Sequence, residues 1–140
     1  MSVTVEDIVA ARGRIASGIS ETPCTPSASL SELCRAEIYC KLEYLHRTGS
    51  FKERGARNAL MLLSPEQQRR GAISASAGNH ALGMAYHGGM LSIPVTVVMP
   101  RFAPLIKVRI AASLERWWFC TVIIWRKPVL TLMSSHCNEG

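Results

Sequence analysis

Apolar positions along the chain switch between the spacing of helices and the spacing of strands. Ile8, Ala11 and Ile15 recur every three to four residues, after Thr4, a residue suited to capping a helix. Apolar and polar residues then alternate over 38–42, which predicts a half-buried strand. The chain therefore begins with a helix, and its first strand follows some twenty residues later.

Further elements follow from turn and cap signals. Ser50 and Glu53 have capping-box spacing and predict a helix that continues to Leu63. Ser64 and Pro65 open another helix that Gly71 ends. The remaining predictions are a loop over 21–29, a short helix through 30–33, strands over 72–76, 95–99 and 121–125, a helix over 80–86 that Gly88 and Gly89 stop, and a helix from Pro104.

The alternation of strands and helices predicts the fold class: α/β, a parallel sheet flanked by helices. The wholly apolar strand over 95–99 is of the kind buried on both faces. In an open α/β sheet, ligands bind beyond the carboxyl ends of the strands. Two loops lie at such ends, 49–52 and 76–80, and we expect the chemistry there.

Composition and charge narrow the class of protein. The 140 residues are 48% hydrophobic, enough for one domain with a core. The first twelve residues lack the basic start and apolar block of a signal peptide, and no apolar run is long enough to span a bilayer, so we expect a cytoplasmic protein that does not contact membranes. The net charge is +6, but residues 101–140 hold six Lys and Arg against two Glu. No basic stripe accompanies the organised motifs, and we expect no nucleic-acid partner.

The five cysteines form no C-x-x-C pair and no cluster with histidine. We expect free thiols packed as small apolar groups and no metal site. Neither G-x-G-x-x-G nor G-x-x-x-x-G-K occurs, which disfavours a nucleotide-binding domain.

Lys52 stands in the first turn of a helix, where the macrodipole disfavours a cation. Partial burial beside Phe51 would add to that effect, and a neutral amine is what carbonyl chemistry requires. The alternative interpretation is a solvent-facing lysine whose stem crosses the helix end.

The second loop, Ser74 to Ala81, is built of small residues and precedes a helix whose free N–H groups can bind a carboxylate or phosphate. Ser76 adds a hydroxyl and Asn79 an amide. The alternative is that Ser76 and Asn79 only cap the helix and that His80 is structural.

Taken together, the loops resemble a family. Residues 41–59, with Ser50-Phe51-Lys52-Glu53-Arg54-Gly55-Ala56, resemble the threonine/serine dehydratases (ammonia-lyases), pyridoxal-phosphate (PLP) enzymes of the tryptophan-synthase-β-like fold (fold type II). Ser76-Ala77-Gly78-Asn79-His80-Ala81 and 98–108 resemble two further segments of that family. The resemblance covers roughly Val5 to Val108.

The resemblance implies a cofactor, PLP, and a role for each matching residue. Lys52 and Ser76 are the expected catalytic residues, with Lys52 forming a Schiff base with PLP and moving protons at the substrate α-carbon. Phe51, Lys52 and Asn79 are expected to bind the cofactor. Ser76, Gly78, Asn79 and His80 are expected to bind the substrate. The implied reaction converts L-threonine or L-serine to a 2-keto acid and ammonia.

Two alternatives stay open within the same fold. Serine racemases resemble the second loop but place a second Ser where this chain has Ala77, which has no proton to give. A catalytically inactive remnant or binding module would keep the fold without holding PLP. The sequence also leaves a homo-oligomer open.

The resemblance also implies a division of the chain. Residues 1–45 correspond to a segment of the family's large domain, 46–108 to the core of the small α/β domain, and 109–140 to a divergent tail. The tail holds all three tryptophans, which favours an aberrant segment, with an aromatic interface as the alternative. The family's Gly-rich loop for the PLP phosphate has no counterpart in that tail.

Overall fold

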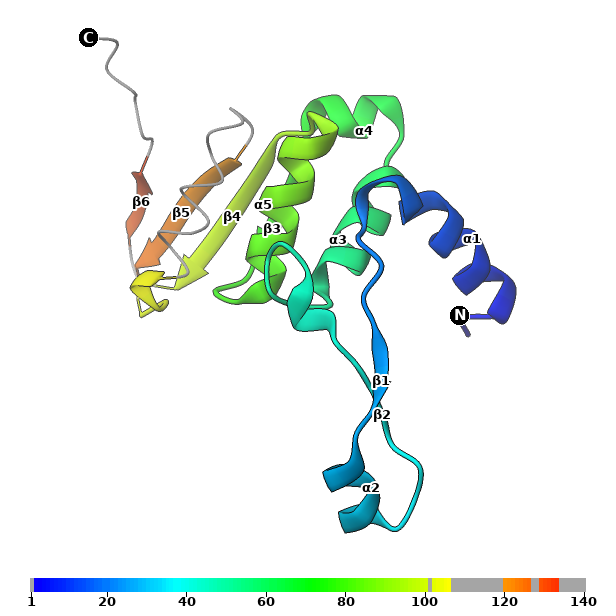
Figure 1. The fold of residues 1–140 in the computed structure, drawn as a ribbon. Coiled ribbons are helices and arrows are strands. Elements are labelled where there is room, and N and C mark those ends of the chain that lie inside the picture. The colour runs from blue at the N-terminus through cyan, green and yellow to red at the C-terminus, as the bar shows by residue number, and fades with distance from the viewer. Residues whose placement is uncertain (1, 101, 107–119, 127–128, 134–140) are drawn as a thin grey trace, which may run out of the picture.

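The computed structural model describes residues 2–100, 102–106, 120–126 and 129–133, and Figure 1 shows their arrangement. The helices are α1 (Val5–Ile15), α2 (Ala28–Cys34), α3 (Lys52–Met61), α4 (Pro65–Arg70) and α5 (Asn79–Leu91), with the short 3-10 helices η1 (Ala16–Gly18) and η2 (Glu43–Leu45). The strands are β1 (Cys24–Pro26), β2 (Tyr39–Lys41), β3 (Ala72–Ala75), β4 (Val95–Pro100), β5 (Cys120–Arg126) and β6 (Val129–Met133).

The main sheet has the strand order β3-β4-β5-β6. The pairs β3–β4 and β4–β5 are parallel, in registers that pair Ala72 with Val95 and Val95 with Cys120. The β5–β6 pair is antiparallel. The predicted parallel sheet flanked by helices is therefore confirmed, and β6 is an element that the sequence did not predict.

The core lies between β4 and helices α3 and α5. In Figure 1, α5 lies between the sheet and α3, and α1 lies on the outer side of α3. The largest fully buried apolar side chains of this core are Leu60, Leu82, Ile93, Met99, Val95 and Val97. Because the start of α5 follows β3 directly, this packing brings the start of α3 close to the carboxyl end of that strand.

A smaller unit extends away from this core (Figure 1). Strands β1 and β2 pair antiparallel, with Cys24 opposite Lys41, and α2 connects them. None of residues 23–45 is buried. We call residues 23–42 the arm.

Several local predictions are confirmed. Thr4 and Asp7 form a capping box at the start of α1, and Ser64 and Gln67 form one at the start of α4, with Pro65 at the favoured first position. The predicted strands at 38–42, 72–76 and 121–125 are present as β2, β3 and β5.

Other predictions are wrong in detail. The expected loop over 21–29 contains β1, because its backbone pairs with β2. Helix α5 does not stop at Gly88 and Gly89 but continues to Leu91 and ends at Ser92, which adopts the left-handed conformation (φ 55°). A Cβ on Gly88 would lie 2.4 Å from Cγ2 of Val95, so this glycine permits close packing of the helix on β4 and does not end the helix.

Burial along β4 also differs from expectation. Along β4, Val95, Val97 and Met99 are buried but Thr96 and Val98 are only half-buried, so the strand is fully covered on one face, the side on which α5 packs.

The cysteines Cys24 and Cys34 are exposed, because the arm has no core in which a thiol could pack. Cys24, Cys34 and Cys40 are free, as expected. The helix predicted from Pro104 falls mainly on residues 107–119, outside the described residues. In the part of the chain that the structure describes, no helix has both the length and the apolar character needed to cross a membrane.

Candidate functional site

Lys52 is the first residue of α3. Phe51 is the N-cap, and its side chain cannot accept a hydrogen bond. The expected capping box is wrong. The Oγ of Ser50 accepts a long hydrogen bond from the N–H of Lys52 (3.4 Å), and the carboxylate of Glu53 reaches the N–H of Thr48 instead of that of Ser50. The tight turn over 47–50, with Gly49 at φ 72°, makes this reach possible because it folds the chain back over the helix start.

The Lys52 side chain is exposed, and so is that of Phe51, which is 59% exposed. The partial burial expected for this pair is therefore wrong. Lys52 stands at the edge of the buried stripe of α3 (Glu53, Ala56, Arg57 and Leu60), four residues before Ala56. It is the first residue of the helix, so its side chain extends beyond the helix end, where no earlier turn covers it. The amine of Lys52 lies 5.1 Å from the centroid of the Phe51 ring and remains accessible to an incoming carbonyl compound.

The second loop connects β3 to α5. The N–H of Ser76 donates to the carbonyl of Val98 on β4 (3.0 Å), and the N–H of Gly78 donates to the Oγ of Ser76 (3.2 Å). Gly78 is the N-cap of α5 and provides no side-chain cap. Ser76 thus ties the loop to the sheet and shapes the turn. It does not cap α5, so the alternative interpretation of Ser76 as a helix cap is wrong.

The start of α5 has free space beside Gly78. A Cβ placed on Gly78 would meet nothing within 4 Å, and Ser76, Gly78, Asn79 and His80 are all half-buried. The first N–H groups of a helix lack intrahelical acceptors and favour an anion. This end of the helix therefore suits an anionic group such as a carboxylate or a phosphate.

The two loops are brought together by a close contact between α3 and α5. A Cβ on Gly83 would lie 3.2 Å from the carbonyl oxygen of Lys52 and 3.3 Å from the Cβ of Ala56. Gly83 is one turn beyond Asn79 in α5, so the backbone of Lys52 lies beside the first turns of the helix that the Ser76–Asn79 loop precedes. Figure 1 shows α3 and α5 side by side.

Sequence reasoning missed a buried polar pair behind this contact. Glu53 is 2% exposed and His87 is fully buried, and Oε2 of Glu53 lies 3.5 Å from Nε2 of His87. The contact is close but does not have hydrogen-bond geometry, since both His87 ring nitrogens lack a hydrogen-bond partner among the described residues. Burial, only partly offset by the Glu53 charge, lowers the pKa of His87 from 6.5 to about 4. The signal in the sequence was the position of Glu53 on the apolar stripe of α3.

A second polar network joins the N-terminal segment to α3. The guanidinium of Arg54 binds both carboxylate oxygens of Glu43, and Glu43 also accepts from the hydroxyl of Thr22 (2.6 Å) and contacts His46 (3.1 Å). The hydrogen bonds from Arg54 are the main reason that the pKa of Glu43 falls from 4.5 to about 2. This network fixes the chain immediately before the Lys52 turn.

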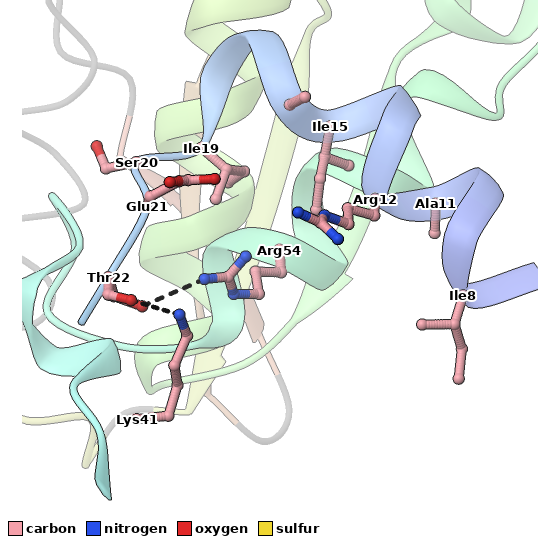
Figure 2. A pocket seen from close by; sticks show the side chains of 11 residues that line it. Ile8, Ala11, Arg12, Ile15, Ile19, Ser20, Glu21, Thr22, Lys41 and Arg54 are labelled. Carbon is pink, nitrogen blue, oxygen red and sulfur yellow. Dashed lines mark hydrogen bonds between the residues drawn. The ribbon is translucent and has the colours of Figure 1, made fainter. Parts of the chain in front are cut away.

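A hollow of about 540 Å³ lies on the other side of this network (Figure 2). The figure shows Thr22 bonded to Arg54 and Lys41 at one end and the apolar face of α1 at the other. The lining residues do not include Lys52, Ser76, Asn79 or His80. The predicted helix face of Ile8, Ala11 and Ile15 is found here, although only Ile15 is buried.

The geometry can be compared with known proteins. The family model of pyridoxal-phosphate dependent enzymes matches residues 15–116, which include both loops. The chain belongs to this family. The match runs past Val108, where the resemblance in the sequence fades, and it includes Lys52 and the Ser76–His80 segment.

The similar proteins include the enzymes that the sequence motifs indicated. The chain is 47% identical over 106 residues to the L-threonine ammonia-lyase of Thermotoga maritima (76% of this chain, 26% of the relative), and 44% identical over 115 residues to the catabolic L-threonine dehydratase TdcB of Escherichia coli (82% and 34%). The crystal structure of serine racemase from Dictyostelium discoideum superposes with a TM-score of 0.81 at 34% identity, over 89% of this chain and 40% of that one. The chain thus spans between a quarter and about a third of the length of these two curated relatives.

Proposed function

We propose that this chain carries the lysine-bearing portion of a PLP-dependent ammonia-lyase that converts L-threonine or L-serine to a 2-keto acid and ammonia. The observation that supports the proposal is the packing of the Lys52 backbone against Gly83, one turn beyond Asn79 in the helix that the Ser76–Asn79 loop precedes, together with the exposure of the Lys52 side chain. The similarity to the threonine ammonia-lyase and to TdcB supports the choice of substrate class.

The described residues fit the reactive end of the cofactor. Lys52 offers the primary amine that a carbonyl carbon requires, and no side chain of the N-cap residue blocks the start of α5. PLP, when bound, supplies an electron sink for the bond that breaks at the α-carbon. We propose that Phe51 packs near the cofactor ring and that the amide of Asn79 contacts the cofactor.

We assign the remaining steps to residues of this chain. The amine of Lys52 takes the proton from the substrate α-carbon, and the β-hydroxyl leaves as water on taking up a proton, so that the proton count is restored. Hydrolysis of the remaining unsaturated amine consumes one water and gives the 2-keto acid and ammonia. The hydroxyl of Ser76 and the N–H groups at Asn79 and His80 hold the substrate carboxylate and thereby orient the α-carbon toward Lys52. Gly78, whose N–H donates to the Ser76 hydroxyl, lets the substrate approach because it has no side chain. The hydrogen bond from the N–H of Ser76 to the carbonyl of Val98 supports this role, because it fastens the backbone of Ser76 to β4.

We further propose the domain division that the sequence resemblance implies. Residues 1–45 would belong to a large domain and residues 46–108 to the core of a small α/β domain, followed by a divergent tail. The arm, without a buried residue of its own, is consistent with a segment that packs on a larger body.

The second candidate is racemisation of serine, favoured by the superposition on serine racemase. Ala77 argues against it, since a methyl group cannot exchange a proton on the opposite face of the substrate. The third candidate is a non-catalytic module of the same fold, favoured by the exposure of Lys52.

The experiment is to add PLP to the purified chain, record the absorbance band of lysine-bound PLP, trap the adduct with borohydride and locate it by peptide mass spectrometry. We expect an adduct at Lys52 that is absent in Lys52→Ala, and release of a 2-keto acid from L-threonine or L-serine. An adduct without keto acid, together with formation of D-serine from L-serine, would favour the racemase. The absence of an adduct at Lys52 in the unmutated chain would reject the enzyme and favour the non-catalytic module.

A further inference from the structure

Glu53, the residue directly after Lys52, is a buried carboxylate. Its side chain is 3% exposed although it stands in the first turn of a helix, where glutamate is usually solvated. Burial of a carboxylate costs free energy unless polar groups face it. The groups that face Glu53 therefore indicate what the residue does in this fold.

Two groups from different segments meet the Glu53 carboxylate. One oxygen accepts a hydrogen bond from the N–H of Thr48, in the turn that precedes Lys52. The other lies 3.5 Å from Nε2 of His87, in the third turn of α5. A single side chain thus connects the turn before Lys52 to the helix that packs behind it.

Both sides of the Lys52 backbone are held as a result. On α5, Gly83 touches the carbonyl of Lys52, and His87, four residues later on the same face, touches Glu53. On the other side, the bond from Thr48 closes the turn onto the helix. The first turn of α3 has two other restraints, the hydrogen bonds of Arg54 to Glu43 and the long bond from the Lys52 N–H to Ser50 Oγ. Phe51 supplies no cap, so the contacts of Glu53 add the restraint that links this turn to α5.

We propose that Glu53 is a positioning residue for Lys52: its contacts with Thr48 and His87 hold the first turn of α3 so that the Lys52 amine is presented beside the start of α5. This inference deepens the proposed function and rests on it for the role of Lys52. The ring of His87 is uncharged at neutral pH, and in the tautomer that carries the proton on Nε2 it turns an N–H dipole, not a lone pair, toward the carboxylate oxygen 3.5 Å away.

The test compares variants of equal side-chain length in the full chain. Glu53→Met fills the same space but accepts no hydrogen bond, whereas Glu53→Gln keeps an acceptor for the Thr48 N–H and can face His87 with its amide. Glu66→Met is the matched control, since Glu66 also stands in the first turn of a helix but its side chain is 72% exposed. His87→Leu removes the contact on α5 and leaves the bond from Thr48 in place. Thermal unfolding of each variant establishes that it is folded.

Two measurements follow. Amide hydrogen exchange over residues 47–53, without any cofactor, reports the order of the first turn. Borohydride trapping with PLP reports the yield at Lys52 relative to Lys41, whose amine bonds to the carbonyl of Thr22 and serves as an internal standard.

In Glu53→Met, we expect the backbone amides of residues 47–53 to exchange hydrogen faster than in the unmutated chain. We also expect the ratio of Lys52 to Lys41 labelling to fall about tenfold, since small displacements of a reacting group cost large factors in rate. His87→Leu is expected to change both readouts in the same direction. Glu53→Gln is expected to keep both close to their values in the unmutated chain, and Glu66→Met to change neither. A merely structural role would lower the unfolding temperature of Glu53→Met without moving the labelling ratio of the folded protein.

The positioning role is overturned if folded Glu53→Met exchanges its amide hydrogens over 47–53 at the rate of the unmutated chain. If Glu53→Met does not fold, the same result in folded His87→Leu overturns it. It is equally overturned if Glu53→Gln changes both the hydrogen exchange over 47–53 and the labelling ratio as much as Glu53→Met does. A missing adduct at Lys52 in the unmutated chain would instead reject the proposed function, and hydrogen exchange would still decide whether Glu53 orders the turn.

Discussion

The guanidinium of Arg54 holds both oxygens of the Glu43 carboxylate, at 2.7 Å from Nε to Oε2 and 2.9 Å from Nη2 to Oε1. Arg54 belongs to α3, and Glu43 precedes the turn that leads into it. Such a two-point contact fixes orientation as well as distance. The segment that enters the candidate site is therefore anchored two residues beyond Lys52.

This contact predicts a loss of stability in acid. Because Arg54 lowers the pKa of Glu43 from 4.5 to about 2, the unfolded chain binds a proton more readily than the folded chain between these values. The stabilisation is complete above about pH 4.5 and is lost as the pH falls toward 2. We expect Glu43→Gln to lower the free energy of unfolding by about 1–3 kcal/mol at pH 7 and by far less near pH 2, measured by urea denaturation. An equal loss at both pH values would contradict the assignment.

His87 predicts a separate acid-sensitive window. Its pKa falls on folding from 6.5 to about 4, so the unfolded chain takes up a proton in that range while the folded chain does not. The free energy of unfolding should decrease by roughly 3 kcal/mol as the pH drops from 6.5 to 4, and this group should add no slope above that window. In His87→Leu the slope between pH 6.5 and 4 should largely disappear. Denaturation curves at several pH values check this, with Glu66→Gln as a surface control.

Two glycines in helices should respond oppositely to alanine. A Cβ on Gly88 would lie 2.4 Å from the stiff Val95 side chain and 3.1 Å from the carbonyl of Ile93, so Gly88→Ala should destabilise the fold by about 1–3 kcal/mol. A Cβ on Gly55 would meet nothing within 4 Å, so Gly55→Ala should stabilise α3 by about 0.5–1 kcal/mol. Melting temperatures of the two variants provide the comparison. A destabilised Gly55→Ala would show that this helix face is covered.

Elements with strong local signals were predictable from the sequence. The caps at Thr4 and Ser64 act through their own next three residues, and β-branched runs such as 95–99 have few conformational alternatives. The resemblance at Lys52 and at Ser76–His80 gave the family, which the family model confirms.

What could not be predicted depends on contacts between distant segments. Glu53 has the spacing of a cap partner for Ser50, yet its carboxylate turns inward because the 47–50 turn and α5 together offer it an N–H and an imidazole. Gly88 has the local character of a helix terminator, and only the approach of β4 shows that it is a packing residue. Strand β1 pairs with a segment fifteen residues away, which no local pattern encodes.

The arm has a consequence for how the chain unfolds. Its two strands are joined by a short ladder, from Cys24–Lys41 to Pro26–Tyr39, and no side chain within it is buried. Two-stranded ribbons without a core are marginal in water. On warming, the ribbon should therefore open while the α3–α5 core is still intact, so that melting has two steps. A protease such as trypsin would reach Arg35, at the exposed tip, before any site within that core.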